Sequence, residues 1–492
     1  MVGFREIPQN LRVPLFFAEL DNSRANSGTA QVLRTLIIGQ QGASGTYPAG
    51  IPVLMEGVPS VKVRSGPGTM LALMAEWYRK RDSFGETWVL PLADNPAGVV
   101  ATGTITVTSA ATAAGTLNLY VAGDRVQVYV APSQTTAQIA AAIAASINAD
   151  TDQPVTAAAT TNAVTLTAKH KGTIGNDIDL RLNYRGSAGG EATPPGLAVT
   201  ISPMSGGTTA PVLDTALAIL GDMPFDFIIC PYTDSTSLDA LKTFLASRWS
   251  WDRMLYGGAF TAFRGTLSAV NTQGLSRNDS HVVTLPFNGS PRPAWLWAAN
   301  FGGAAAVSLR ADPGLPLQGL ALDVEPPPVE SRWNIGERNG LLFAGMSTST
   351  VQDDGTVVLE TIVTNYRTNV LGQPDDSYLY VERLYTLAAA IRRLKASTTS
   401  KFGRFKLASD GTAFAPGSNI VTPSIIKDHI LGEYRAMERA GLVQEYETFR
   451  RNLVVERNAS NRCRVDGLVP IVPIDQLRQL AMLVQFRNSG EA

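Results

Sequence analysis

The sequence predicts a multidomain α/β (α+β) protein: a layered α/β core with an inserted β-rich domain, a C-terminal α+β domain, and extended N- and C-terminal arms. A length of 492 residues corresponds to several domains at about 100–200 residues each. Segments typical of strands and helices alternate before residue 99 and again after residue 205, with a segment of different composition between them. This pattern is typical of a layered core interrupted by an insertion.

Residues 1–31 are expected to form an arm and a linker. Prolines punctuate the first part, and residues 21–30 are polar and contain Gly and Ser. An arm of this kind either docks onto its own domain or adds a strand to a neighbouring chain. Its apolar side chains are Phe4, Ile7, Leu11, Val13, Leu15 and Phe17.

Residues 32–98 and 206–395 are expected to form the α/β core. Strands that alternate with helices at this spacing predict a largely parallel sheet. The strand-like segments lie at 32–39, 86–92, 225–231, 254–260 and 281–286. The helix-like segments lie at 67–81, 210–220, 235–247, 267–273 and 293–309.

Residues 99–205 are expected to form the inserted β-rich domain. They have few bulky apolar side chains, are dense in Ala, Thr and Gly, and include one Ala-rich helical segment at 136–148. The Gly- and Pro-rich segment 186–196 predicts a surface loop. Six segments alternate as half-buried strands do, at 104–108, 116–121, 126–130, 164–168, 178–182 and 197–201.

A hairpin followed by a buried helix is predicted between residues 346 and 394. Asp353-Asp354-Gly355 supplies the turn between two strand-like segments. Asp375, Asp376 and Ser377 supply helix-start chemistry before residues 378–394, whose apolar side chains recur at helical spacing.

Residues 396–479 are expected to form the C-terminal domain, with residues 480–492 as a second arm. The domain is predicted to contain a helix at 423–440 and an antiparallel strand pair at 449–456 and 462–469. Residues 480–487 alternate as a terminal strand does.

Composition excludes several classes of protein. Lys plus Arg (41) and Asp plus Glu (42) give a formal net charge of −1, so no direct nucleic-acid binding is expected. The two cysteines, Cys230 and Cys463, offer no disulfide framework or zinc spacing, which fits a reducing cytoplasm. Cys230 ends an apolar run and is expected to be buried. The N-terminus lacks a signal-peptide pattern, and residues 293–309 are too short and too rich in Gly and Ala to span a bilayer.

Catalysis is not expected, because a Ser-His-Asp triad needs a histidine base and the chain has only 3 histidines. His170 lies between two lysines and is interpreted as a solvated loop residue, and His429 as an exposed helix residue. His281 follows Asn278-Asp279-Ser280, but side chains adjacent on one strand do not converge on a substrate. Gly345-Met346-Ser347 lacks the context of a nucleophile elbow.

No cofactor or metal site is expected either. Gly66-Pro67-Gly68 lacks the rest of a phosphate-binding motif, and residues 353–355 lack the later ligands of a calcium loop. Tryptophans at 249, 251, 295, 297 and 333 are interpreted as core residues. Mixed charges near the C-terminus predict a solvated or subunit-facing surface, formed by Glu433, Arg435, Glu438, Arg439, Arg450 and Arg451.

Residues 331–395 also contain four short motifs in a fixed order. They are Gly345-Met346-Ser347-Thr348, the Asp354-Gly355 turn, the segment from Thr364 to Asn369 (TNYRTN), and Tyr378-Leu379-Tyr380-Val381. This series resembles the sheath proteins of contractile phage tails, most closely those of Mu-like phages. The segment from VERNASN to VQFRN resembles the C-terminus of the same family, and the resemblance covers nearly the whole chain apart from residues 99–205.

The resemblance implies a structural protein and not an enzyme. Sheath proteins form helical layers around a tail tube, and contraction drives the tube through the host envelope for genome delivery. The implied partners are other copies of the chain, the tail tube protein, and the baseplate and tail-terminator proteins. The implied location is the contractile tail of the virion, assembled in the host cytoplasm, with residues 99–205 facing outward as an outer domain and the C-terminal domain facing the tube.

The resemblance further implies that arms of adjacent subunits extend a sheet in a third subunit by strand exchange. Two alternatives remain open: the sheath of a phage-derived bacteriocin or secretion machine, and a soluble α/β hydrolase with an accessory β-domain. The residues expected to serve in the inter-subunit arms are Phe4, Ile7, Val13, Leu15, Phe17, Leu483, Val484 and Phe486.

Overall fold

The structure is a computed structural model that describes residues 32–415 and 417–486. The chain divides into two compact units. The described part of the smaller unit consists of residue 32, Ala390–Arg439 and Glu445–Pro470, and that of the larger unit of Leu33–Ala389, Ala440–Gln444 and the residues from Ile471 to 486. The finer division into five parts stays a prediction.

The larger unit is built around a six-stranded sheet in the order β13-β12-β11-β1-β3-β2. Neighbouring strands are parallel except β2, which pairs antiparallel with β3. Every residue of β1 and of β13 is buried, as expected for strands covered on both faces. The strands are β1 (Thr35–Gln40), β2 (Val53–Leu54), β3 (Thr87–Leu92), β11 (Phe227–Ile229), β12 (Gly258–Arg264) and β13 (Val282–Phe287). The predicted α/β core is confirmed.

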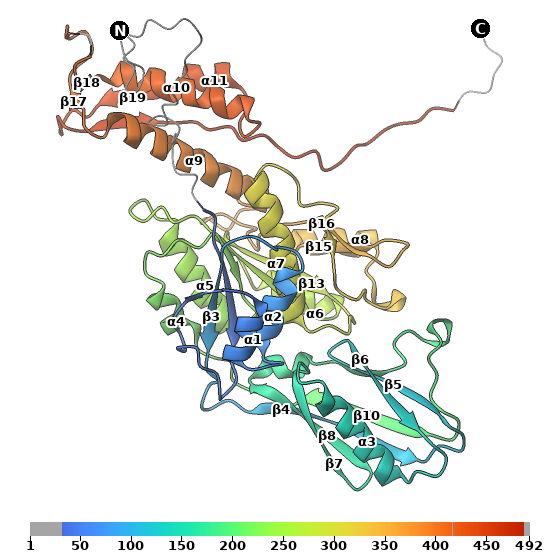
Figure 1. The fold of residues 1–492 in the computed structure, drawn as a ribbon. Coiled ribbons are helices and arrows are strands. Elements are labelled where there is room, and N and C mark those ends of the chain that lie inside the picture. The colour runs from blue at the N-terminus through green and yellow to red at the C-terminus, as the bar shows by residue number, and fades with distance from the viewer. Residues whose placement is uncertain (1–31, 416, 487–492) are drawn as a thin grey trace, which may run out of the picture. The chain divides into compact units, whose positions relative to one another are not determined.

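Helices cover both faces of this sheet (Figure 1). The chain leaves β1 toward β3 through α1 and α2, and it leaves β11 in the opposite direction, through α5 to β12 and through α6 to β13. Because such crossovers are right-handed, the two sets of helices lie on opposite faces. The helices are α1 (Val58–Ser65), α2 (Met70–Arg79), α4 (Leu213–Ile219), α5 (Ser235–Arg248), α6 (Leu267–Leu275) and α7 (Ala294–Ala311).

Helix α7 is buried along most of its length and packs beside α2 and against β12. Gly302 allows this close approach, because a Cβ atom there would lie 2.1 Å from Cδ1 of Ile229 on the sheet. A helix that is apolar on nearly all sides is typical of a core position.

Residues 99–205 form two antiparallel sheets and one helix within the larger unit. The sheets have the orders β10-β4-β8-β7 and β6-β5-β9. The six predicted strands and the helix are present, while β7 was not predicted because its sequence, VTAAAT, has little apolar alternation. The elements are β4 (Val100–Ser109), β5 (Gly115–Val121), β6 (Asp124–Val130), α3 (Thr136–Ala149), β7 (Val155–Thr160), β8 (Ala163–Lys171), η1 (Thr173–Asp177), β9 (Leu180–Leu182), η2 (Ser187–Gly189) and β10 (Ala198–Ser205).

The predicted hairpin and buried helix are also present. Strands β15 (Thr348–Val351) and β16 (Val357–Thr361) pair antiparallel, and β14 (Ala321–Leu322) pairs with β16. Asp354 accepts a hydrogen bond from the amide of Thr356 at 2.8 Å, which fixes the turn. The short elements η3 (Val329–Ser331) and α8 (Ile335–Phe343) precede the hairpin, and α9 (Val381–Phe402) follows it.

The smaller unit packs helix α10 against a short helix and a two-stranded sheet. The ring of Tyr434 on α10 stacks on the ring of Phe449 with centroids 3.6 Å apart. The predicted strand at 449–456 is therefore wrong in its first half, because this stacking holds Phe449 in a helix. The elements are β17 (Lys406–Leu407), β18 (Ile420–Val421), α10 (Pro423–Arg439), α11 (Tyr446–Asn452), β19 (Val454–Arg457) and β20 (Val465–Leu468).

Candidate functional site

The end of the described chain presents large apolar side chains to solvent. Leu483, Val484 and Phe486 are 88%, 86% and 88% exposed. Residues 480–486 form no strand, so the strand predicted there is wrong for the single chain, because a strand needs a partner to complete its hydrogen bonds. An exposed run of this kind indicates a docking element. The expected N-terminal arm residues, Phe4, Ile7, Val13, Leu15 and Phe17, lie outside the described residues.

The segment before this exposed run is held by the larger unit. The carbonyl of Val472 accepts a hydrogen bond from the Gln444 amide at 2.9 Å. Asp475 pairs with Arg383 at 2.9 Å, and Arg478 pairs with Glu382 at 2.7 Å. Residues 471–479 are therefore held by the larger unit, whereas residues 480–486 are exposed.

Strands β19 and β20 form a sheet of only two strands. They pair antiparallel over four residues each, from Val454 opposite Leu468 to Arg457 opposite Val465. Neither strand has a second neighbour among the described residues. A two-stranded sheet is marginally stable by itself, and each outer edge is a template for a strand from another chain.

The predicted charged surface lies on α10 and α11, and its members are not alike. Glu433 pairs with Arg393 at 3.1 Å, and Glu438 accepts a hydrogen bond from the Tyr446 amide at 3.0 Å. The guanidinium of Arg435 lies over the Tyr446 ring at 4.2 Å. Each of these three side chains therefore has a partner within the smaller unit.

The remaining three charged residues, Arg439, Arg450 and Arg451, are exposed, as Arg435 is. Arg450 pairs with Glu447 at 3.0 Å, three residues away on the same helix, and such surface pairs contribute at most about 1 kcal/mol. These arginines are available to another chain.

The insert covers part of the crevice where α/β proteins usually hold ligands. That crevice lies at the carboxyl ends of the strands where the chain reverses direction, here between β1 and β11. Gln40 at the end of β1 donates to Asp94 at 2.7 Å and to the carbonyl of Lys171 at 2.8 Å. Asp94 also accepts from the Lys171 amide at 3.1 Å. The end of β8 thus covers the carboxyl end of β1.

His170 belongs to this closure, so its interpretation as a solvated loop residue is wrong. It is 7% exposed, its Nε2 accepts a hydrogen bond from the Met70 amide at 3.0 Å, and its Nδ1 lies 3.2 Å from Asp94. Burial raises the pKa of Asp94, but hydrogen bonds from His170, Lys171 and Gln40 outweigh burial and leave that pKa below its ordinary value. The cluster joins the inserted residues to the core.

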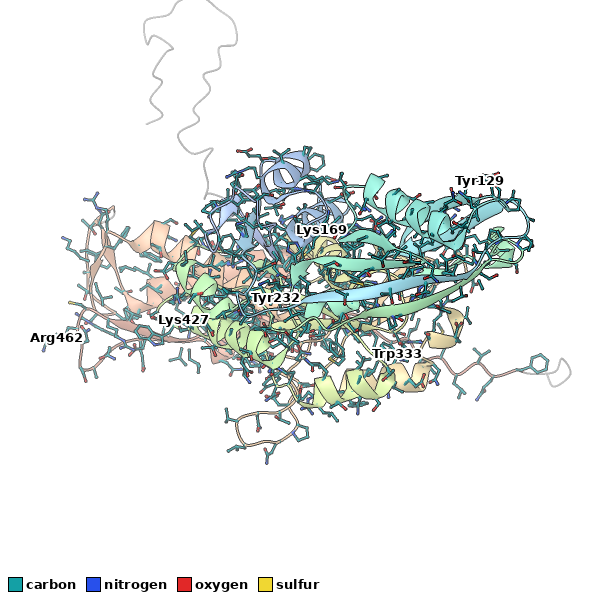
Figure 2. The ribbon with its side chains drawn as sticks, turned by 90° about the horizontal axis from the view of Figure 1, so that it is seen from below. Tyr129, Lys169, Tyr232, Trp333, Lys427 and Arg462 are labelled. Atoms are coloured by element: carbon teal, nitrogen blue, oxygen red, sulfur yellow. The ribbon has the colours of Figure 1, made fainter. Side chains whose placement is uncertain are left out.

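A second group of contacts also joins the insert to the core. Lys169 donates to the Pro67 carbonyl at 2.9 Å, and Figure 2 shows it beside the core, with Tyr129 at the far end of the insert. Arg292, 7% exposed, pairs with Asp124 at 2.7 Å and with Glu325. These contacts fix the insert at several separate points.

A cavity of about 150 Å³ remains at the carboxyl ends of β11 and β12. It is lined by η1 and by Tyr232, Asp234 and Arg264, among other residues. The described residues contain no group of three or more His, Cys, Asp or Glu side chains suited to a metal ion. In the described part of the chain no helix is long and apolar enough to span a membrane.

Only part of the candidate triad comes together, because the hydroxyl of Ser280 lies 3.3 Å from Nδ1 of the adjacent His281 while the acidic candidate is directed elsewhere. The ring of His281 stacks on Trp249 at 4.5 Å, and burial lowers its pKa to about 4. Asp279 instead pairs with Arg277 at 2.7 Å. Ser347 is buried, and its hydroxyl donates to the carbonyl of Val363 at 3.0 Å. Each of these side chains has a structural contact instead of a shared site.

Other interpretations have mixed outcomes. His429 is half-buried with its ring against Phe402, so its interpretation as an exposed residue is wrong. Burial and then the charge of Lys401 lower its pKa. Cys230 is buried as expected, and burial raises the pKa of its thiol to about 12. Trp297 is buried, but Trp251 is 89% exposed, so its interpretation as a core residue is wrong.

Comparisons with known proteins agree along the whole chain. Residues 206–364 match the phage tail sheath protein central domain, and residues 373–487 match the phage tail sheath C-terminal domain. The chain is 40% identical over 486 residues to the Mu-like prophage FluMu tail sheath protein of Haemophilus influenzae, with 99% of each chain covered.

Solved structures with a similar fold include a sheath tail protein from Desulfitobacterium hafniense, at 14% identity and a TM-score of 0.49, covering 94% of this chain and 97% of that one. The helical sheath of the anti-feeding prophage in its contracted state matches at 13% identity and a TM-score of 0.47, covering 98% of this chain and 100% of that one.

Proposed function

The chain belongs to the tail sheath family of Mu-like phages, and we propose that many copies of it polymerise helically around a tail tube and contract to drive that tube through the host envelope. The observation that carries this proposal is the 40% identity that extends over 99% of both chains. The partners would be further copies of the chain, the tail tube protein, and the baseplate and tail-terminator proteins, within the contractile tail of the virion.

We infer that polymerisation uses strand exchange. The exposed residues from Leu480 to Phe486 would add a strand to the open β19–β20 sheet of a neighbouring copy. Backbone hydrogen bonds would join the two chains, and the apolar face formed by Leu480, Met482, Val484 and Phe486 would be buried on the acceptor. This contact would satisfy both features at once, because among the described residues the segment 480–486 has no strand partner and the two-stranded sheet has no further strand at either edge.

A structural role also suits the covered end of β1. Asp94, Gln40 and Lys171 hydrogen-bond one another where an enzyme of this architecture would bind its substrate. The hydrolase alternative would need that space. The alternative of a bacteriocin or secretion-machine sheath concerns the particle and leaves the proposed assembly unchanged.

The strand-exchange proposal is tested by substitutions at two neighbouring positions of the arm. Adjacent side chains of an extended strand point to opposite faces. Val484→Asp should place a charge on the face that is buried on the acceptor and abolish tubes of the purified protein in negative-stain micrographs. Gln485→Asp places the same charge one residue away on the other face and should leave tubes intact.

Circular dichroism should show the same folded monomer for both variants, because residues 480–486 make no strand within the single chain. Normal tubes from Val484→Asp, or from a chain that lacks residues 480–492, would refute strand donation by this arm.

A further inference from the structure

We propose that the ion pair between Arg478 and Glu382 is the anchor of the C-terminal arm and that assembly requires the anchor as well as the arm. This inference rests on the strand donation proposed above. It concerns residues that would not contact the neighbouring copy. Their role would be to fix where the donated segment leaves its own subunit.

Glu382 is a fully buried acidic residue in the first turn of α9. One carboxylate oxygen accepts a hydrogen bond from Arg478 at 2.7 Å, and the other accepts one from the Leu317 amide at 2.9 Å. A buried charge is strongly unfavourable unless it is paired and hydrogen-bonded. The larger unit therefore contains a site that is satisfied only while Arg478 occupies it.

Arg478 fits this site by shape as well as by charge. Its side chain is 11% exposed, and its guanidinium lies over the ring of Tyr380 at 4.0 Å. A planar guanidinium can pair with a carboxylate and stack on an aromatic ring at the same time, which the ammonium of lysine cannot do. The contact is therefore specific to arginine.

The other contacts of residues 471–479 are weaker. Asp475 pairs with Arg383, but the Asp475 side chain is 66% exposed, and exposed pairs contribute little. Gln476 donates to the Gly314 carbonyl at 3.3 Å. Two residues beyond Arg478, Leu480 is 70% exposed. The Arg478–Glu382 pair is therefore the last buried contact before the free arm.

An anchor of this kind raises the local concentration of the arm at its acceptor, because a short connection restricts the volume that the arm can sample. Without it the arm would be released from an earlier point and would sample a larger volume. Assembly would then need a higher protein concentration, while the arm itself stayed chemically intact.

The test compares full-length Arg478→Ala with Asp475→Ala, which removes only the exposed pair beside it. Hydrogen–deuterium exchange of residues 471–479 in the monomer reports the anchor directly. Arg478→Ala should speed exchange there and raise the critical concentration for tubes about tenfold. Asp475→Ala should change both by less than about twofold.

A third variant covers the case in which the lone Glu382 charge prevents folding. Glu382→Gln with Arg478→Gln neutralises both partners and leaves no buried unpaired charge. It should fold, exchange faster at 471–479, and assemble only at raised concentration. Wild-type exchange and wild-type assembly in this double variant would overturn the anchor.

The two proposals fail differently. If Val484→Asp abolishes tubes while Arg478→Ala assembles at the wild-type concentration, strand donation stands and the anchor is wrong. If Val484→Asp itself forms normal tubes, strand donation is wrong, and the proposed role of the anchor in assembly is wrong with it.

Discussion

At the scale of single residues, Arg292 and His170 decide how residues 99–205 meet the core. Arg292 bridges Asp124 of the insert and Glu325 of the core, and its guanidinium lies 4.7 Å from the ring centre of Trp77. Gly123 makes room for it, because a Cβ atom there would lie 2.7 Å from the Arg292 side chain. Arg292 and His170 thus place polar groups in buried positions, and each of these groups has a hydrogen-bonding partner there.

The role of His170 could not be predicted from its neighbours in sequence. Two flanking lysines indicated a solvated loop, whereas its partners, Met70 and Asp94, lie 100 and 76 residues away. The burial of Cys230 was predictable, because an apolar run indicates a buried strand. The local sequence pattern thus predicts burial for a residue such as Cys230, whose apolar run indicates a buried strand. It does not predict burial for His170, whose partners are distant in sequence.

His281 gives the chain a stability term that depends on pH. Burial lowers its pKa from 6.5 to about 4. The unfolded chain therefore binds more protons than the folded one between those values, and stability falls as the pH drops from about 6.5 to 4. The loss should reach roughly 3 kcal/mol.

His281→Phe should remove this term while it keeps an aromatic contact with Trp249. The free energy of unfolding, measured in urea at pH 8 and at pH 5, should differ by less in the variant than in the wild type. The same difference in both proteins would show that His281 does not contribute.

At the scale of elements, the sequence predicted most strands and helices but not the ones that depend on distant contacts. The alternating segments of the core and insert were found with small shifts in their ends. The two-residue strand β2 gives no periodic signal, and α11 replaces a predicted strand because Phe449 stacks on Tyr434. Helix α8 was missed although Asn334 and Glu337 form a capping box that signals its start.

The insert provides an element-scale prediction. Composition alone would suggest a domain that can be excised without effect on the core. The contacts predict otherwise, because excision of residues 99–205 would leave Asp94 without His170, the Met70 amide without its acceptor, and Arg292 without Asp124.

We therefore expect the excised core, rejoined by a short Gly-Ser linker, to unfold at a lower urea concentration than the full chain. Unfolding at the same urea concentration as the full chain would show that the insert contributes nothing to the core.

At the scale of the whole molecule, the near-zero net charge and the exposed arginines of α10 and α11 bear on assembly. Individual rim pairs contribute at most about 1 kcal/mol, but a polymer repeats each pair at every subunit. Large apolar contacts alone would favour a single arrangement. Charge pairs can select a register without preventing a change between arrangements.

Reversing Arg450 and Arg451 to Glu should therefore impair tube formation without unfolding the monomer, as judged by circular dichroism. Wild-type tube length should also respond to ionic strength, because salt screens exposed pairs. Arg185→Glu, on the insert in the larger unit, is a control with the same charge change per residue. Unchanged tubes from the double variant at both low and high salt would exclude this role.

If the proposed anchor and strand donation hold, the position of Arg478 would limit how neighbouring subunits can move. Only Gln479 separates the anchor from the first exposed arm residue, Leu480. Two residues of extended chain span about 7 Å. If the arm stays paired throughout contraction, the acceptor sheet can never travel farther than this from the donor at that point. Neighbouring subunits would then rotate about this short connection instead of sliding past one another. Contraction would proceed by rotation of subunits that stay connected.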